Sequence, residues 1–152
     1  MPQMAREVLL GFARRHALAV QASVSPAGAP QAALVGIVVN DDFEIFFDTR
    51  ANSRKSENLR RDGRIALVIG WDLAEACTLQ VEGRTDEPRG QELERWKQLY
   101  FARFPDGVER QAWPDITYFR VRPVWARFSD FRTPEPTITE FSEYDLSRPQ
   151  GS

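Results

Sequence analysis

The chain has 152 residues and a formal net charge of −2 at pH 7, and 42% of its residues are hydrophobic and 28% charged. This balance predicts one folded domain and argues against a disordered chain, a membrane span and a broadly basic surface for nucleic acid. The sequence has one cysteine and one histidine, so we expect no intrachain disulfide, no metal site and a reducing, cytoplasmic location.

The first third of the chain predicts one helix and three strands. Apolar residues at helical spacing indicate a helix over residues 4–15. The alternation in LAVQASV indicates a strand over residues 18–24, and two further apolar runs, at 31–39 and 43–48, are separated by the turn-forming sequence Asn-Asp-Asp. We expect the second and third strands to pair as a hairpin.

A short helix and a buried strand are predicted for the middle of the chain. The helix covers residues 54–61, with Asn52 or Ser53 as its N-cap and Gly63 just beyond its last turn. The nearly continuous apolar run at 64–71 then indicates a strand that is buried on both faces. The chain is therefore expected to return to the core directly after the helix.

The next strand, predicted at 77–86, has two unlike faces. One side is apolar, whereas the other carries Thr78, Gln80, Glu82 and Arg84. A polar face in the middle of a sheet needs a reason.

The last third predicts a helix, a long strand and a tail. The helix, at 89–104, has an apolar stripe that packs across the sheet, and the strand, at 116–131, is interrupted near Pro123. Later prolines predict an extended C-terminal tail, so we assign residues 1–132 to the domain and 133–152 to the tail. Six antiparallel strands with local connections favour a mainly β fold, a closed or partly closed barrel with peripheral helices.

The start of the short helix gathers groups that bind phosphate. Ser53, Arg54 and Lys55 offer a hydroxyl, a guanidinium, an ammonium and backbone amides. A solvated cationic surface is the alternative, but cations without a ligand are unfavourable at the positive end of a helix dipole. His16 is the only histidine and the sequence has no glycine-rich nucleotide motif, so we predict no catalytic residue supplied by the protein.

Two segments, FFDTRANSRKSENLRRDGRIALVIG and CTLQVEGRTDEP, resemble the FMN-binding split-barrel superfamily of pyridoxamine 5'-phosphate oxidase, and the resemblance runs from about residue 5 to 131. It implies a six-stranded antiparallel split barrel that binds FMN at a homodimer interface. It further implies that Arg54 and Lys55 contact the phosphate, and that Thr78 or Gln80 approaches the flavin ring from a neighbouring strand. The positions expected to contact the cofactor are Asp48, Thr49, Ser53, Arg54, Lys55, Val35, Gly36, Ile37, Thr78, Gln80, Trp125 and Arg127.

Within this set, the resemblance places Val35, Gly36 and Ile37 along the flavin ring. Trp125 and Arg127 either reach the ring of the partner's flavin or belong to the core. The last strand, with Phe119, Trp125, Phe128 and Phe131, has more aromatic surface than one barrel needs, which favours a two-fold homodimer.

The sequence departs from the oxidase itself at two positions. Ala33 and Val38 stand where the oxidase has an arginine and a lysine, and no histidine follows His16. The chain better resembles the short flavin proteins related to this oxidase. We therefore expect an FMN-dependent oxidoreductase that acts on a small-molecule redox substrate. The alternatives are a flavin-binding sensor or storage protein without turnover and a deazaflavin-dependent reductase, whereas haem binding is disfavoured because only His16 offers an imidazole.

Overall fold

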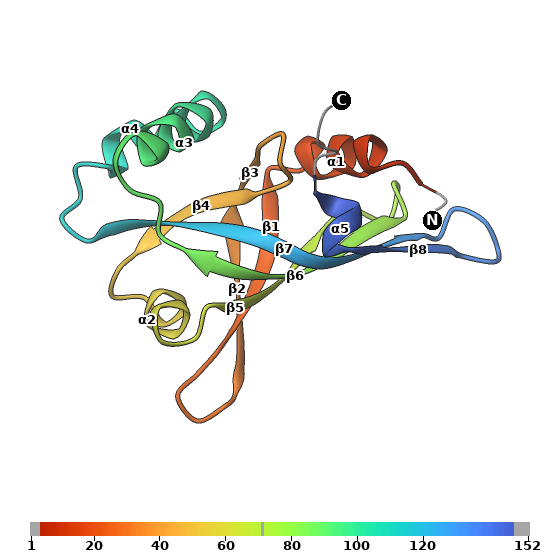
Figure 1. Ribbon diagram of the computed structural model, residues 1–152, viewed down its shortest axis with the longest axis horizontal. Coiled ribbons are helices and arrows are strands. Elements are labelled where there is room, and N and C mark those ends of the chain that lie inside the picture. The colour runs from red at the N-terminus through yellow and green to blue at the C-terminus, as the bar shows by residue number, and fades with distance from the viewer. Residues whose placement is uncertain (1–3, 71, 148–152) are drawn as a thin grey trace.

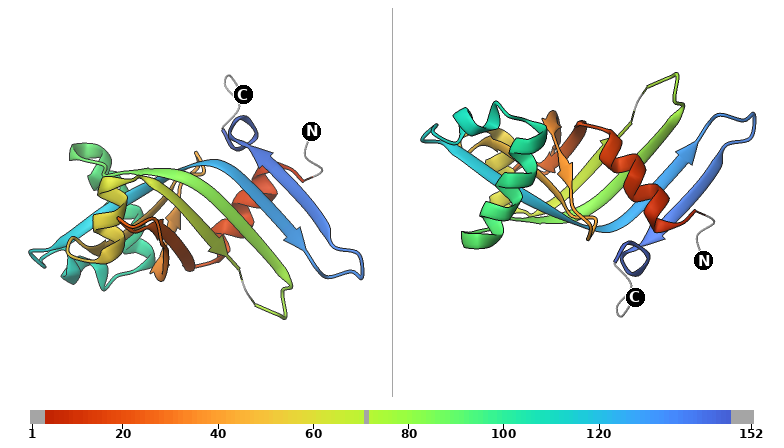
Figure 2. Two further views of the ribbon diagram at one scale, coloured as in Figure 1. Left: turned by 90° about the horizontal axis from the view of Figure 1, so that it is seen from below. Right: turned by 90° about the horizontal axis from the view of Figure 1, so that it is seen from above.

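The computed structural model describes residues 4–70 and 72–147, which form one strongly curved antiparallel sheet with helices at its periphery (Figures 1 and 2). The strands are β1 (Leu18–Val24), β2 (Pro30–Gly36), β3 (Val38–Val39), β4 (Ile45–Arg50), β5 (Arg64–Ile69), β6 (Cys77–Asp86), β7 (Ile116–Asp130) and β8 (Thr137–Ser142). The helices are α1 (Arg6–Arg15), α2 (Arg54–Arg61), α3 (Gly90–Arg103), α4 (Gly107–Arg110) and α5 (Glu143–Leu146).

The hydrogen-bonded order of the sheet is β2-β1-β5-β6-β7-β4-β3, and β8 also pairs with β7. The long strand β7 joins the two ends of the sheet. One of its edges pairs with β6 along most of its length, while the other pairs first with β4 and then with β8. This curved half-barrel confirms the expected mainly β, split-barrel class with peripheral helices.

The sheet has a core face and an outer face, because residues paired directly across neighbouring strands point to the same side. Leu67, Val81 and Ala126 are partners on the core face, where α1 adds Leu9 and Phe12. On the outer face, α3 covers β4 and the first half of β7 with a second apolar cluster around Trp96 and Tyr100. Over β1, β5 and β6 the outer face stays partly exposed.

The predicted strand at 31–39 is interrupted, so the expected hairpin is mostly wrong. Ile37 separates β2 from β3 and donates its backbone N–H to the carbonyl of Ala17. Strand β2 pairs with β1, and only the two residues of β3 pair with β4. The strand expected to be buried on both faces is also different: β5 alternates, and Val68 on its outer face is 38% exposed. Residue 71 lies outside the described residues.

The end of the chain belongs to the sheet, so the expected separate tail is wrong for Thr137–Leu146. Strand β8 pairs with β7, and α5 closes with a capping box. Phe141 and Leu146 are buried members of the main core. The boundary predicted at residue 132 therefore divides one sheet, and residues 148–152 lie outside the described part. Among the described residues, none of the helices has the length and hydropathy that crossing a membrane requires.

Candidate functional site

The first turn of α2 is fixed by its own hydroxyl groups. Ser53 is the N-cap, and its Oγ accepts a hydrogen bond from the backbone N–H of Ser56 at 3.2 Å. Thr49, near the end of β4, lies with its Oγ1 3.2 Å from the Ser53 Oγ. A serine cap and a short helix over 54–61 agree with the sequence analysis. The arrangement leaves the amides of Arg54 and Lys55 at the helix start, where intrahelical acceptors are lacking.

A buried asparagine attaches α2 to the sheet. Asn58 Nδ2 donates to Ser23 Oγ on β1 at 3.1 Å and to Gln31 Oε1 on β2 at 2.9 Å. Asn58 is 3% exposed and Ser23 2%, so the bond between them lies inside the protein, and the two bonds hold the helix against the core side of β1 and β2. Polar residues on the core face of a strand thus have a structural role here.

A cavity of about 130 Å³ lies between the start of α2 and this polar stretch of β1 and β2. Its lining consists of Gln21, Ser23, Gln31, Ala32, Ala33, Arg54 and Lys55. Burial holds the pKa of Lys55 below its ordinary value, and the negative charge of Asp48 partly opposes this shift. Within the described ranges, neither Arg54 nor Lys55 forms an ion pair. The cavity therefore contains positive charge that the protein does not neutralise by direct contact.

Gln21 adds an unsatisfied acceptor to the same cavity. Its side chain is 1% exposed, and its Oε1 has no hydrogen-bond partner among the described residues. Leaving a buried polar atom unpaired is costly, and such atoms usually have a ligand or an ordered water as partner. Gln21 was not predicted, because large apolar side chains such as Leu18 and Val20 usually turn inward. Here both point outward, and the small Ala19 is the apolar residue of β1 on the core face.

Asp48, the neighbour of Thr49 on β4, is held by two helices. Its Oδ2 accepts from Arg110 Nε at 2.9 Å, and its Oδ1 lies 3.1 Å from the hydroxyl of Tyr100. Burial and the charge of Asp48 raise the pKa of Tyr100. Both carboxylate oxygens thus bind side chains of α3 and α4, which gives Asp48 a structural role in the protein as described.

The residues expected along the flavin ring present backbone rather than side chains. Val35 is 6% exposed and Ile37 fully buried, and both belong to the main core. Between them, Gly36 packs so closely under Phe104 that a Cβ there would lie 2.9 Å from the ring. A ligand at this stretch of chain would therefore meet main-chain atoms.

The remaining predicted residues lie on the outer face, away from α2. Gln80 on β6 pairs with Arg127 on β7, and Thr78 and Trp125 occupy the same face. Arg127 Nε donates to Glu140 at 3.0 Å, and its guanidinium lies 5.3 Å from the centre of the Trp125 ring. Trp125 is partly exposed rather than a core residue.

The predicted site is thus divided between the two faces of the sheet. Gln21 and Leu67 are cross-strand partners on the core face, beside Lys55, whereas Gln80 belongs to the outer face. One chain does not bring its phosphate-binding group and its outer-face group together. No cluster of three or more potential metal ligands occurs in the described part of the chain.

The chain is similar in sequence to one known protein family over most of its length. A sequence model of the family described as pyridoxamine 5'-phosphate oxidase matches residues 5–130. No curated protein matches the chain.

Several solved structures share the fold. A heme binding protein from Mycobacterium smegmatis has 14% identity and a TM-score of 0.82, with 96% of this chain and 61% of that protein covered. The heme storage protein HutZ from Vibrio cholerae has 18% identity and a TM-score of 0.66, with 91% and 98% covered. A pyridoxamine 5'-phosphate oxidase-related, FMN-binding protein from Nostoc punctiforme has 14% identity and a TM-score of 0.66, with 90% and 85% covered. This chain thus spans about three fifths of the Mycobacterium smegmatis protein, and at these identities the likeness concerns the fold.

Proposed function

This chain belongs to the pyridoxamine 5'-phosphate oxidase family, and we propose that it is an FMN-binding oxidoreductase that transfers hydride or electrons to or from a small molecule. One observation carries the proposal: Arg54 and Lys55 line a cavity at the start of α2 and have no acidic partner among the described residues. A solvated surface patch does not explain a lysine that is half-buried. A bound anion does.

The residues around this cavity fit the phosphate end of FMN. A phosphate needs several N–H donors and positive charge, and the side chains and first helical amides of Arg54 and Lys55 provide both. The unpaired Oε1 of Gln21 suits a hydroxyl donor, which the ribityl chain next to the phosphate supplies. Within the described ranges, no second cluster of this kind lines the cavity, which favours FMN over FAD.

We further propose that two copies of the chain share each cofactor. The phosphate-binding group lies on the core side of the sheet, whereas Gln80 and Trp125 lie on the outer face, so a second copy must supply one of the two groups. The outer face also exposes Leu34 and Val68, at 56% and 38%, which isologous pairing would bury.

The aromatic residues in and after β7 offer less surface for this homodimer than the sequence suggested. Phe119 and Phe128 are buried, at 1% and 5% exposure, so they supply no surface for a partner. Phe131 is 53% exposed, and Trp125 is partly exposed. The apolar outer face of β1, β2 and β5 therefore supports the dimer better than the aromatic content of β7.

The division of labour follows from the residues present. When bound, FMN supplies the hydride and electron chemistry. Arg54 and Lys55 would hold the phosphate, and the Oε1 of Gln21 would accept a hydrogen bond from a ribityl hydroxyl. The reaction requires no nucleophile from the protein.

Two alternatives use the same residues: a flavin-binding protein without turnover, and a deazaflavin-dependent reductase. Haem, which some proteins of this fold bind, is less well supported. The only histidine, His16, has Nδ1 2.8 Å from the carbonyl of Phe12 and Nε2 3.0 Å from the carboxylate of Glu75. Both ring nitrogens are engaged, so ligating an iron would require breaking one of these contacts.

The visible spectrum of the purified protein, together with the mass of the small molecule released on denaturation, tests the proposal. We expect flavin absorbance and the mass of FMN, reduction by a reduced nicotinamide or dithionite, and reoxidation in air. Release of FAD, of a deazaflavin or of haem would contradict the cofactor assignment. Bound FMN that no electron donor other than dithionite reduces would instead favour the protein without turnover.

A further inference from the structure

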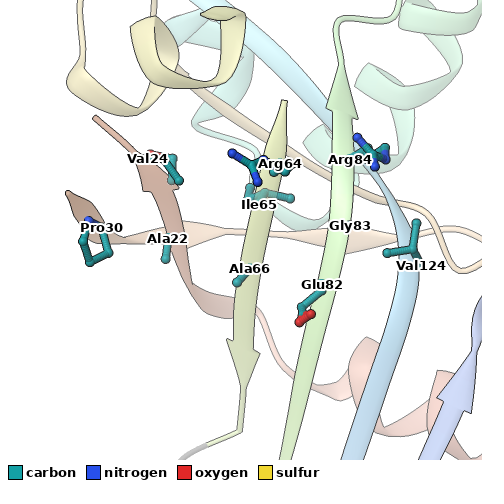
Figure 3. A pocket seen from close by; sticks show the side chains of 11 residues that line it. Ala22, Val24, Pro30, Arg64, Ile65, Ala66, Glu82, Gly83, Arg84 and Val124 are labelled. Carbon is teal, nitrogen blue, oxygen red and sulfur yellow. The ribbon is translucent and has the colours of Figure 1, made fainter. Parts of the chain in front are cut away.

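A second cavity, of about 400 Å³, lies on the outer face over β1, β5 and β6 (Figure 3). Two small side chains, Ala22 and Ala66, are directly paired on β1 and β5 and form its floor. Three charged residues, Arg64, Arg84 and Glu82, also line it. Ligand pockets typically have volumes of about 300–1,000 Å³ and combine an apolar lining with a few polar groups. This cavity has the size and the composition of a small-molecule site.

Three arginines cross the sheet at one end of the cavity. Arg64, Arg84 and Arg122 are direct cross-strand partners on β5, β6 and β7, and we refer to them as the arginine row. Figure 3 shows Arg64 and Arg84 at the same level, with Glu82 farther along β6. Like charges placed directly opposite one another destabilise a sheet. An anion beside the row would relieve that repulsion.

The members of the arginine row differ in their acidic partners. Arg64 donates from Nε and Nη2 to Asp62, at 3.0 and 2.7 Å, and this contact lowers the pKa of Asp62 to about 2. Arg122 Nε donates to Glu44 at 3.1 Å. The side chain of Arg84 forms no hydrogen bond or ion pair with any residue in the described ranges. The central charge of the row is therefore the one without compensation.

We propose that this cavity binds a small, flat molecule with a carboxylate or phosphate group, and that this group lies against Arg84. The body of the ligand covers Ala22 and Ala66, whose short side chains create the space. The carboxylate of Glu82 lines the same cavity and repels simple anions, so a ligand with a hydrogen-bond donor at that end is favoured. Glu82 is the direct cross-strand partner of Trp125, so this site adjoins the outer-face part of the proposed FMN site and rests on the proposed dimer leaving the cavity open.

Titration calorimetry with benzoate and with phenyl phosphate tests the proposal on the protein saturated with FMN. We expect saturable binding of at least one probe, and the tighter of the two identifies the anion. Arg84→Ala should weaken that binding about tenfold or more, as expected for the loss of a charge-assisted hydrogen bond. Ala66→Leu should block it by filling the floor, whereas Glu82→Gln should strengthen it by removing a nearby negative charge.

Two control variants test whether probe binding is specific to this cavity. Arg95→Ala removes an exposed arginine on α3, outside the lining of the cavity, and should leave probe binding unchanged. Arg15→Ala on α1 should also leave it unchanged, because Arg15 lies outside the lining as well. Since Arg84 has no acidic partner in the described part of the chain, Arg84→Ala should not lower the melting temperature.

Three outcomes overturn the proposal. The first is that neither probe binds saturably, and the second is that Arg84→Ala leaves the affinity unchanged. The third is that Arg84→Ala and Ala66→Leu alter the sedimentation coefficient without any effect on probe binding, which would identify the cavity as part of an interface between copies. The first two results count against this site alone, because FMN binding is measured separately, whereas the third would place the cavity in the interface between copies proposed above.

Discussion

Arg120 on β7 and Lys55 on α2 are both cations drawn into the protein, yet of the two only Arg120 forms ion pairs among the described residues. The side chain of Arg120 is 5% exposed; it donates to Asp86 at 2.8 Å and also contacts Glu92 on α3. Lys55 is half-buried beside a cavity, without an ion pair among the described residues. A buried charge must be paired, so the comparison separates a charge that supports the fold from one that we propose binds a ligand.

The strongest test of this comparison removes both unpaired cations. Arg54→Ala,Lys55→Ala should weaken FMN binding by a factor of about 10² to 10⁴, since each charge-assisted contact contributes about 1.5–3 kcal/mol. The melting temperature without FMN should stay within a few degrees, because no acid among the described residues loses a partner. Fluorescence titration with FMN measures the first effect and thermal unfolding the second. Unchanged affinity would indicate that both residues are solvated surface cations that do not bind FMN.

The reverse pattern is expected for Arg120. Arg120→Ala should lower the free energy of unfolding by about 2–3 kcal/mol, because it removes two ion pairs; the half-exposed acids can be rehydrated, which keeps the loss below that of a fully buried pair. Urea denaturation measures this loss in the free energy of unfolding. Arg122→Ala is the matched control on the same strand: its side chain is 58% exposed, and the expected loss is below about 1 kcal/mol. Equal losses in the two variants would contradict the distinction.

The titration of Lys55 should give two opposite trends with pH, one in protein stability and one in FMN affinity. Its pKa is lowered by burial, so the free protein releases this proton at a lower pH than the unfolded chain. Without FMN, the contribution of Lys55 to stability should therefore rise with pH. FMN affinity should fall over the same range, by up to about tenfold per pH unit, because the phosphate requires the protonated amine.

Lys55→Arg provides the control for this prediction, since an arginine keeps its charge over the whole range. The FMN affinity of this variant should not fall at alkaline pH, whereas that of the unaltered protein should. A decline of equal size in both proteins would show that another group titrates.

The smallest expected effect concerns the reaction for which the family is named. We expect no measurable oxidation of pyridoxamine 5'-phosphate, because a second phosphate requires a second anion clamp, Val38 stands where the oxidase has a lysine, and the late segment has no matching histidine. Val38 is 3% exposed and packs in the apolar cluster under α3. An assay for pyridoxal phosphate checks this. Turnover within the ordinary range of about 1–1,000 per second would show that other arginines serve instead.

The sequence predicted best those features that rest on local signals. Helix α2 has a serine cap and basic residues at its start, and both faces of β6 follow from its alternation. The orientation of β1 could not be predicted in the same way, because Val20 and Ala19 are both apolar. Burial there is decided by distant partners, such as Asn58 on α2, which binds Ser23.

Pairing between strands distant in sequence also explains the remaining differences between the predicted elements and the structure. The run at 31–39 has the composition of one strand, but the curvature of the sheet divides it at Ile37 between two separate partners. Strand β8 follows a proline-rich segment, and it becomes a strand because the second half of β7 offers a free edge. For the candidate site, the motif identified Arg54 and Lys55, whereas Gln21 required the folded protein.

The length of β7 also sets the order in which this protein can be assembled. Strands β4 and β6 each have one edge that pairs with β7, β8 pairs with β7 as well, and β7 ends at Asp130. During synthesis, one edge of β4 and one edge of β6 therefore stay unpaired until β7 has left the ribosome. Pairings this distant in sequence fold slowly, so a chain truncated before β7 leaves two open sheet edges, the kind of surface that promotes aggregation.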